Sequence, residues 1–60
     1  MTGVVYTSTV VAAAEPYQVA IVDLDNGGRA TVRLEGPLAR IGQRVEFIEE
    51  RNGVPYYRFA

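Results

Sequence analysis

The chain has 60 residues, 48% of them hydrophobic and 22% charged, which leaves room for one hydrophobic core and predicts a single domain over residues 1–60. It contains no cysteine and no histidine, so disulfides, the usual zinc ligand sets and imidazole-dependent catalysis are excluded. Six arginines and no lysine stand against seven acidic residues, and the resulting net charge of −1 argues against a protein that binds phosphate backbones.

The first two predicted strands are Val4–Ala12 and Tyr17–Asp25. The first segment is uncharged and dense in β-branched residues, and its length suits the long, bent first strand of a small barrel. Pro16 then marks a turn, because its ring cannot donate a hydrogen bond to a strand ladder. The second segment is apolar on both faces, which is typical of a strand that is buried on two sides.

An Asn-Gly pair at Asn26 and Gly27 joins the second strand to the third, since this pair supplies the positive φ angles of a tight hairpin. The third strand, Arg29–Glu35, alternates polar and apolar residues and therefore has one wet face. Gly36 and Pro37 end it, and the stretch before the next strand can hold at most one helical turn. The helix between the third and fourth strands of an OB fold is therefore predicted to be absent or vestigial.

The last two predicted strands are Gln43–Glu49 and Val54–Phe59, joined by a second Asn-Gly turn at Asn52 and Gly53. Five short strands with two tight turns and one longer connection predict an all-β, five-stranded Greek-key barrel of the OB type. An SH3-like barrel is the alternative. The long first strand and the position of the longer connection favour the OB form.

No stretch approaches the roughly 20 apolar residues that a membrane span requires. Met1–Ala14 has no basic region ahead of its apolar residues, so we expect no targeting segment. The absence of cysteine fits a cytoplasmic protein, and we expect that location.

No catalytic residue, metal site or cofactor is predicted, and we expect the chain not to be an enzyme. Asp23 and Asp25 share one face of a strand, a pairing that can serve acid–base chemistry or hold a hard cation. Asp25 directly precedes an Asn-Gly turn, however, where acidic side chains commonly bond turn amides, and a cation needs more oxygen ligands than are grouped there. A structural role is favoured for both carboxylates.

Tyrosine and arginine are the residue types that point to binding. OB folds hold single-stranded nucleic acids on aromatic side chains with cationic support, and the same residue types are enriched in protein interfaces. The negative net charge favours packing against a protein partner. Adjacent tyrosines on one strand point to opposite faces, so the two at the end of the chain do not share a platform without a bulge. The candidate ligand-binding or partner-binding residues are Tyr17, Arg29, Arg33, Tyr56 and Tyr57.

Four segments carry a family resemblance: Gly3–Val11, Glu15–Gly27, Ile41–Phe47 and Tyr57–Phe59. Together they resemble the acyl-CoA-associated OB-fold family, long catalogued as a domain of unknown function, whose members usually join a zinc ribbon to an OB barrel beside thiolase-like enzymes. The resemblance covers nearly the whole chain but rests on strand and turn patterns. The chain departs from the family in having no cysteines, hence no zinc ribbon, and in carrying Ala12 where many members have histidine.

The resemblance implies a non-catalytic accessory subunit that packs on a thiolase-like or other acyl-CoA-processing enzyme and helps to form a CoA site, with arginine and tyrosine as contacts. A single-stranded nucleic-acid-binding OB domain is the alternative function. A third possibility is a barrel that self-associates through an open strand edge, because its core is small.

Overall fold

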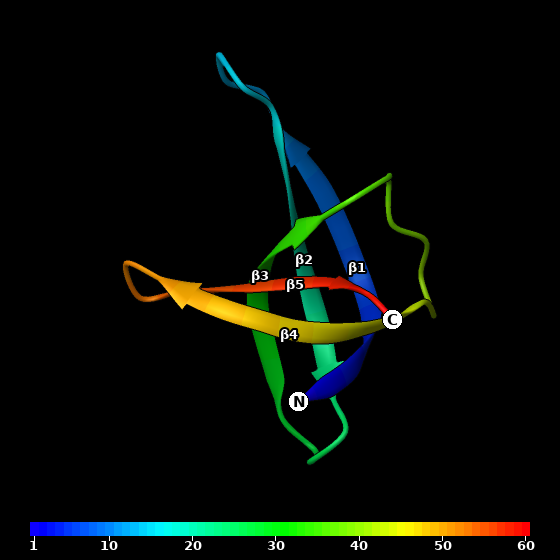
Figure 1. Ribbon diagram of the computed structural model, residues 1–60. Coiled ribbons are helices and arrows are strands. Elements are labelled where there is room, and N and C mark those ends of the chain that lie inside the picture. Colours follow the sequence, from blue (N-terminus) through cyan, green and yellow to red (C-terminus); the bar gives the residue numbers. More distant parts are fainter.

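The computed structural model describes residues 1–60 as five strands joined by turns, with no helix (Figure 1). No helix that could cross a membrane is present. The third and fifth strands have the predicted bounds, and the others shift at their ends by one to two residues. The strands are β1 (Thr2–Val11), β2 (Tyr17–Leu24), β3 (Arg29–Glu35), β4 (Arg44–Arg51) and β5 (Val54–Phe59).

The strands close into a barrel in the order β1-β2-β3-β5-β4. All neighbouring pairs are antiparallel except β3 and β5, which run parallel, and β1 completes the circle by pairing with β4 through Thr2 to Val4. This is the OB arrangement, so the predicted fold is confirmed and the SH3-like alternative is wrong. The β1–β2 hairpin extends beyond the rest of the barrel (Figure 1).

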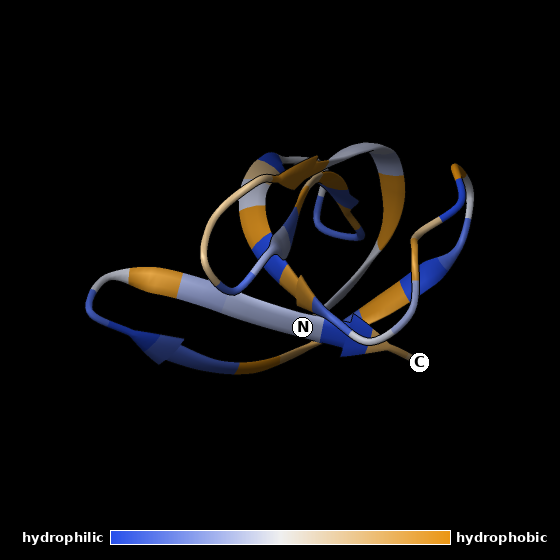
Figure 2. Ribbon diagram, turned by 90° about the horizontal axis from the view of Figure 1, so that it is seen from above, coloured by the Kyte–Doolittle hydropathy of each residue, from blue (hydrophilic) through white to orange (hydrophobic).

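Alternating side chains fill the barrel, as the two-residue period of a strand requires. Seen from above, hydrophobic and hydrophilic residues alternate along the strands as they wrap around the interior (Figure 2). In β2, Ala20 and Val22 are fully buried while Val19 and Ile21 are only half-buried, so β2 has one inner face rather than two. The core consists of Val5, Ala20, Val22, Val32, Leu34, Val45 and Tyr57.

The two Asn-Gly turns differ in type. At the β4–β5 turn, Asn52 and Gly53 both have positive φ, 51° and 78°, as a two-residue type I′ turn requires. At the β2–β3 turn only Gly27 has a positive φ, 100°, and its backbone amide donates a hydrogen bond to the carbonyl oxygen of Leu24. That geometry is a three-residue loop with glycine in the left-handed position, and it still sets the register of β2 against β3.

The β3–β4 connection is held to the barrel by the side chain of Gln18 instead of by a helix. Gln18 is 7% exposed; its amide Nε2 donates to the carbonyl of Pro37 at 3.0 Å, and its Oε1 accepts from the amide of Ala39 at 2.6 Å. Both polar ends of the buried amide are therefore satisfied. Leu38, between the two anchored residues, projects into solvent with 73% of its surface exposed.

At the opposite end of the barrel the two aspartates have structural roles. Asp23 pairs with Arg29 at 2.5 Å, and Asp25 accepts hydrogen bonds from the Thr2 hydroxyl and from the Arg44 guanidinium, the latter at 2.8 Å. Asp25 thereby ties the β2–β3 turn to β1 and β4, where the barrel closes.

The Asp25 contacts make stability depend on pH. Hydrogen bonds from Thr2 and Arg44 lower the pKa of the Asp25 carboxyl. A lowered pKa in the folded state contributes stability above the unfolded pKa, and this contribution is lost as the pH falls through the folded pKa. We expect the melting temperature to fall on acidification between about pH 5 and pH 3, and to fall less in Asp25→Asn. Thermal melts across this range check it; parallel losses in the two proteins would contradict it.

Candidate functional site

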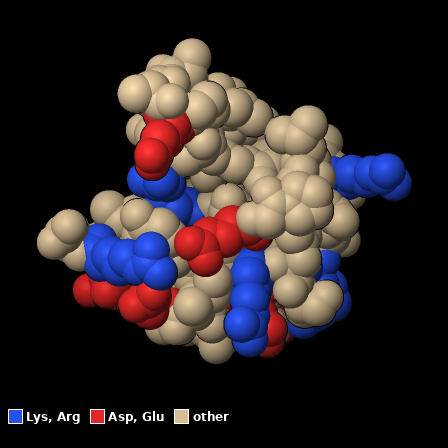
Figure 3. Space-filling model, turned by 45° about the horizontal axis from the view of Figure 1, so that its top comes forward, with Lys and Arg blue, Asp and Glu red and all other residues tan.

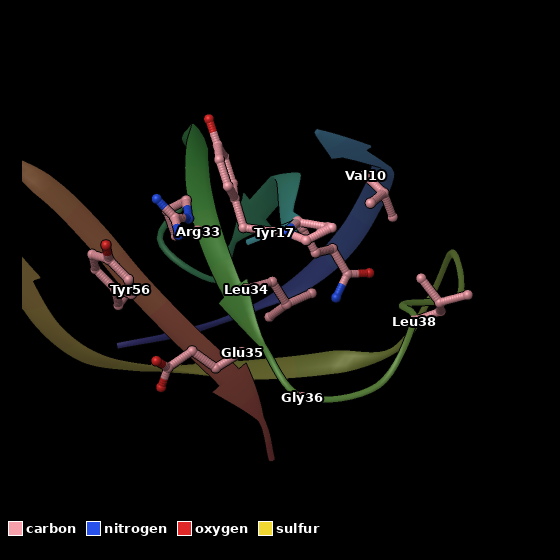
Figure 4. A pocket seen from close by; sticks show the side chains of 10 residues that line it. Val10, Tyr17, Arg33, Leu34, Glu35, Gly36, Leu38 and Tyr56 are labelled. Carbon is pink, nitrogen blue, oxygen red and sulfur yellow. The ribbon is translucent and has the colours of Figure 1, made fainter. Parts of the chain in front are cut away.

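A pocket of about 370 Å³ lies where β2 begins and β3 ends, beside the β3–β4 connection (Figure 4). Its lining is half hydrophobic. Arg33 and Tyr56 lie at one end, Val10 and Leu38 lie at the other, and Leu34 is between them (Figure 4). Because Leu34 is only 4% exposed, the barrel core itself forms part of the pocket wall.

Arginine and tyrosine side chains alternate in what we call the Tyr–Arg ladder: Tyr17, Arg33 and Tyr56, which line the pocket, and Arg51, which stacks on Tyr56 outside the lining. The Arg33 guanidinium carbon lies 3.7 Å from the ring centroid of Tyr17 and 5.3 Å from that of Tyr56. Arg51 stacks on Tyr56 at 4.5 Å. Each distance is within the range of a cation–π interaction, so the ladder holds the arginine side chains in place.

Strand register builds the Tyr–Arg ladder from four strands, with Tyr17 in β2, Arg33 in β3, Arg51 in β4 and Tyr56 in β5. In the antiparallel pairing of β2 with β3, Arg33 lies opposite Val19, which places it diagonally across from Tyr17 on the same face of the sheet. In the parallel β3–β5 ladder Arg33 pairs with Tyr56. Arg51 ends β4 directly before the turn into β5 and is held by Glu49, to which its Nε donates at 2.8 Å.

The ion pairs of the chain leave Arg33 without an acidic partner. The Arg33 guanidinium donates no hydrogen bond to protein and forms no salt bridge, although the residue is half-buried. Arg40 also lacks a carboxylate partner but is exposed on the β3–β4 connection. The other four arginines are paired: Arg29 with Asp23, Arg44 with Asp25, Arg51 with Glu49 and Glu35, and Arg58 with Glu46.

Large apolar side chains surround the far end of the pocket. Val10 is 51% exposed, Leu38 is 73% exposed, and Ile41 in the same connection is 79% exposed. Exposed apolar side chains that occur singly need no explanation, but two that line one pocket indicate a contact surface. The pocket thus joins a cationic end to an apolar end.

The structure brings three of the five predicted binding residues together, namely Tyr17, Arg33 and Tyr56. Arg29 lies elsewhere, stacked at 4.1 Å on Tyr6 and paired with Asp23.

Tyr57 is buried in the core with 3% exposure and contacts Phe47 edge-on, with ring centroids 5.7 Å apart. This burial raises the pKa of its hydroxyl. The physical reason is the strand period: Tyr56 faces outward, so its neighbour must face inward. Tyr57 is therefore not available as a surface contact.

Arg51, Val10 and Leu38 were not among the residues predicted from the sequence to bind a ligand or partner. Arg51 follows an acidic run and precedes a turn, which is the pattern of an ordinary solvated residue. Val10 lies in an apolar strand where exposed and buried positions look alike. Only the three-dimensional fold places Val10 and Leu38 in the lining of one pocket and Arg51 beside it, on the ring of Tyr56.

The side chains that line the pocket are of kinds that bind ligands. No group of three or more histidine, cysteine or acidic side chains is arranged to hold a metal ion. Glu35 is the pocket's carboxylate, and it lies 3.9 Å from Arg51. The arrangement can accept an anionic group at Arg33 and an aliphatic group beside Val10 and Leu38.

Comparison with known proteins gives two matches and one negative result. The family model described as the ChsH2 C-terminal OB-fold domain matches residues 1–49. A solved structure titled Ltp2-ChsH2(DUF35) aldolase is similar to the chain with a TM-score of 0.75 and 30% sequence identity over 97% of this chain. The chain spans 56% of the length of that matched chain. No curated protein matches in sequence.

Proposed function

The chain belongs to the family of ChsH2 C-terminal OB-fold domains, and from this premise we propose that it is a non-catalytic accessory module of an acyl-CoA-processing enzyme. The similar structure is titled as an aldolase that contains an Ltp2 component and a ChsH2(DUF35) component. The observation that carries the proposal is 30% identity over 97% of this chain to that structure. A thiolase-like or aldolase-type enzyme subunit is the partner we infer.

The surface chemistry supports a protein partner. The pocket combines stacked tyrosine and arginine side chains with exposed aliphatic ones, and tyrosine and arginine are the residue types that dominate binding energy at interfaces. The carboxylates Asp23, Asp25, Glu46 and Glu49 are occupied in ion pairs, so none of them is a free acid–base group. We therefore propose contact with the enzyme as the role of this pocket, and a contribution to the enzyme's CoA site as a role of the module as a whole.

Single-stranded nucleic acid is the second candidate ligand. It is supported by the OB barrel and by the outward-facing Tyr17, Arg33 and Tyr56. The charges favour the enzyme partner instead: acidic and basic side chains are interleaved over the face in Figure 3, with no continuous basic track for a phosphate backbone. A salt titration with a short oligonucleotide separates the two functions, because phosphate binding weakens steeply as salt rises.

The direct test mixes the purified chain with a purified Ltp2-type aldolase subunit from the same organism and follows sedimentation velocity. We expect a complex at micromolar concentrations. We also expect Leu38→Glu to weaken it, because a charge replaces an exposed aliphatic side chain at the pocket. A thiolase-like subunit is tested in parallel. Separate sedimentation of the chain from both enzyme subunits would refute the proposal.

A further inference from the structure

Arg33 combines three properties found together in no other arginine of the chain. It is half-buried, it lines a pocket, and it has no carboxylate or hydrogen-bond acceptor within the protein. Arg40, the other arginine without an acidic partner, is exposed and does not line this pocket. A charged group that has lost part of its hydration is stabilised when a group of opposite charge pairs with it.

The stacking around Arg33 determines how that pairing can occur. The ring centroids of Tyr17 and Tyr56 lie 3.7 Å and 5.3 Å from the guanidinium carbon of Arg33, so the two rings restrict the orientation of the guanidinium plane. The N–H donors of a guanidinium lie in that plane and match the two oxygens of a carboxylate. Arg33 is thus pre-positioned to bind a carboxylate with little further loss of side-chain entropy.

The other end of the pocket requires an aliphatic group. Val10 and Leu38 face the pocket from the β1–β2 hairpin and from the β3–β4 connection, with Leu34 between them and Arg33 (Figure 4). Gln18 fixes the position of Leu38 through its bonds to Pro37 and Ala39. An apolar side chain inserted here would remove exposed aliphatic surface from water.

The charge around the pocket favours a single carboxylate over a polyphosphate. Glu35 lines the same pocket, and both Glu35 and Glu49 form ion pairs with Arg51. A ligand with several phosphates would be repelled by these carboxylates, whereas one carboxylate on Arg33 balances one positive charge.

We propose that this pocket receives a segment of the enzyme partner that places an aspartate or glutamate carboxylate on Arg33 and an aliphatic side chain between Val10 and Leu38. The inference rests on the proposed function and names the chemistry of the contact. The Tyr–Arg ladder orients the cation, and the Gln18-anchored connection supplies the apolar wall.

The first experiment measures binding of the Ltp2-type aldolase subunit to the wild type, to Arg33→Gln and to Arg58→Gln by calorimetry. Arg58 is the control because it is exposed on β5 and paired with Glu46 at 3.0 Å. We expect Arg33→Gln to weaken binding roughly tenfold or more and Arg58→Gln to change it by less than about twofold. Wild-type binding with no loss in Arg33→Gln would overturn the inference and leave the proposed function intact.

The second experiment tests the pocket without the enzyme, by NMR titration of the chain with N-acetyl-leucine and, as a control, with its neutral amide. We expect the acid alone to shift the Arg33 Nε–H and the Leu38 methyl signals of the wild type, and we expect the Leu38 shift to be lost in Arg33→Gln. Equal shifts from acid and amide, or none from either, would overturn the inference. Larger Arg33 shifts with CoA than with the acid would also overturn it, in favour of a phosphate ligand.

Discussion

Gly3→Ala is expected to remove about 3 kcal/mol of folding stability, at the upper end of the usual cost of overpacking a core. A Cβ atom at this position would lie 2.5 Å from Cγ1 of Val22 and 2.6 Å from the carbonyl oxygen of Asp23. Neither neighbour can move freely, because Val22 is fully buried and the second contact is with backbone. Gly3 also pairs with β2 and β4 at once, so displacing it disturbs the closure of the barrel.

For a domain of 60 residues, total stability is about 3 to 9 kcal/mol, so the substitution would remove between about a third and all of it. Gly28→Ala is the matched control, since its added Cβ would meet its nearest neighbours at 3.7 Å and 3.9 Å. Urea unfolding should show a change of less than about 1 kcal/mol for this control. Similar midpoints for Gly3→Ala and wild type would contradict the close approach of β1 and β2.

Gln18→Leu is expected to cost about 2 kcal/mol, because it keeps a side chain of similar size while leaving the Pro37 carbonyl and the Ala39 amide without their partners. The β3–β4 connection should then detach from β2. Leu38 lies between the two released residues, so partner affinity should fall together with stability. Urea unfolding measures the loss of stability, and amide exchange at Ala39 measures the detachment of the connection.

Gln43→Leu is the control for the loss of a glutamine side chain. Gln43 accepts a single exposed hydrogen bond, from the amide of Arg40 at 2.5 Å. Its replacement should cost less than about 1 kcal/mol and leave exchange at Ala39 unchanged. Equal destabilisation by the two substitutions would show that Gln18 has no special role in anchoring the connection.

The strands could be predicted from the sequence because their signals are local. Residue alternation gave the bounds of β3, and the two Asn-Gly pairs located both hairpins. The substitute for the missing helix could not be predicted in this way. The bonds of Gln18 to Pro37 and Ala39 join residues about twenty positions apart, and no local pattern distinguishes this glutamine from an exposed one.

The candidate site was predictable only in part for the same reason. The β2–β3 hairpin register alone places Tyr17 near Arg33, since it is set by a tight turn. Tyr56 joins them through parallel pairing of β3 with β5, which is a property of the whole barrel. Arg29 and Tyr57 are of the right residue types, but Arg29 lies elsewhere on the surface, on the ring of Tyr6, and Tyr57 lies in the core.

Partner binding through the pocket is tested most directly by hydrogen–deuterium exchange of the chain with and without the Ltp2-type aldolase subunit. We expect added protection in residues 10–18 and 33–41, which surround the pocket, and none at the β2–β3 turn at the opposite end of the barrel. Protection at that turn with none around the pocket, or no change anywhere, would contradict partner binding through the pocket.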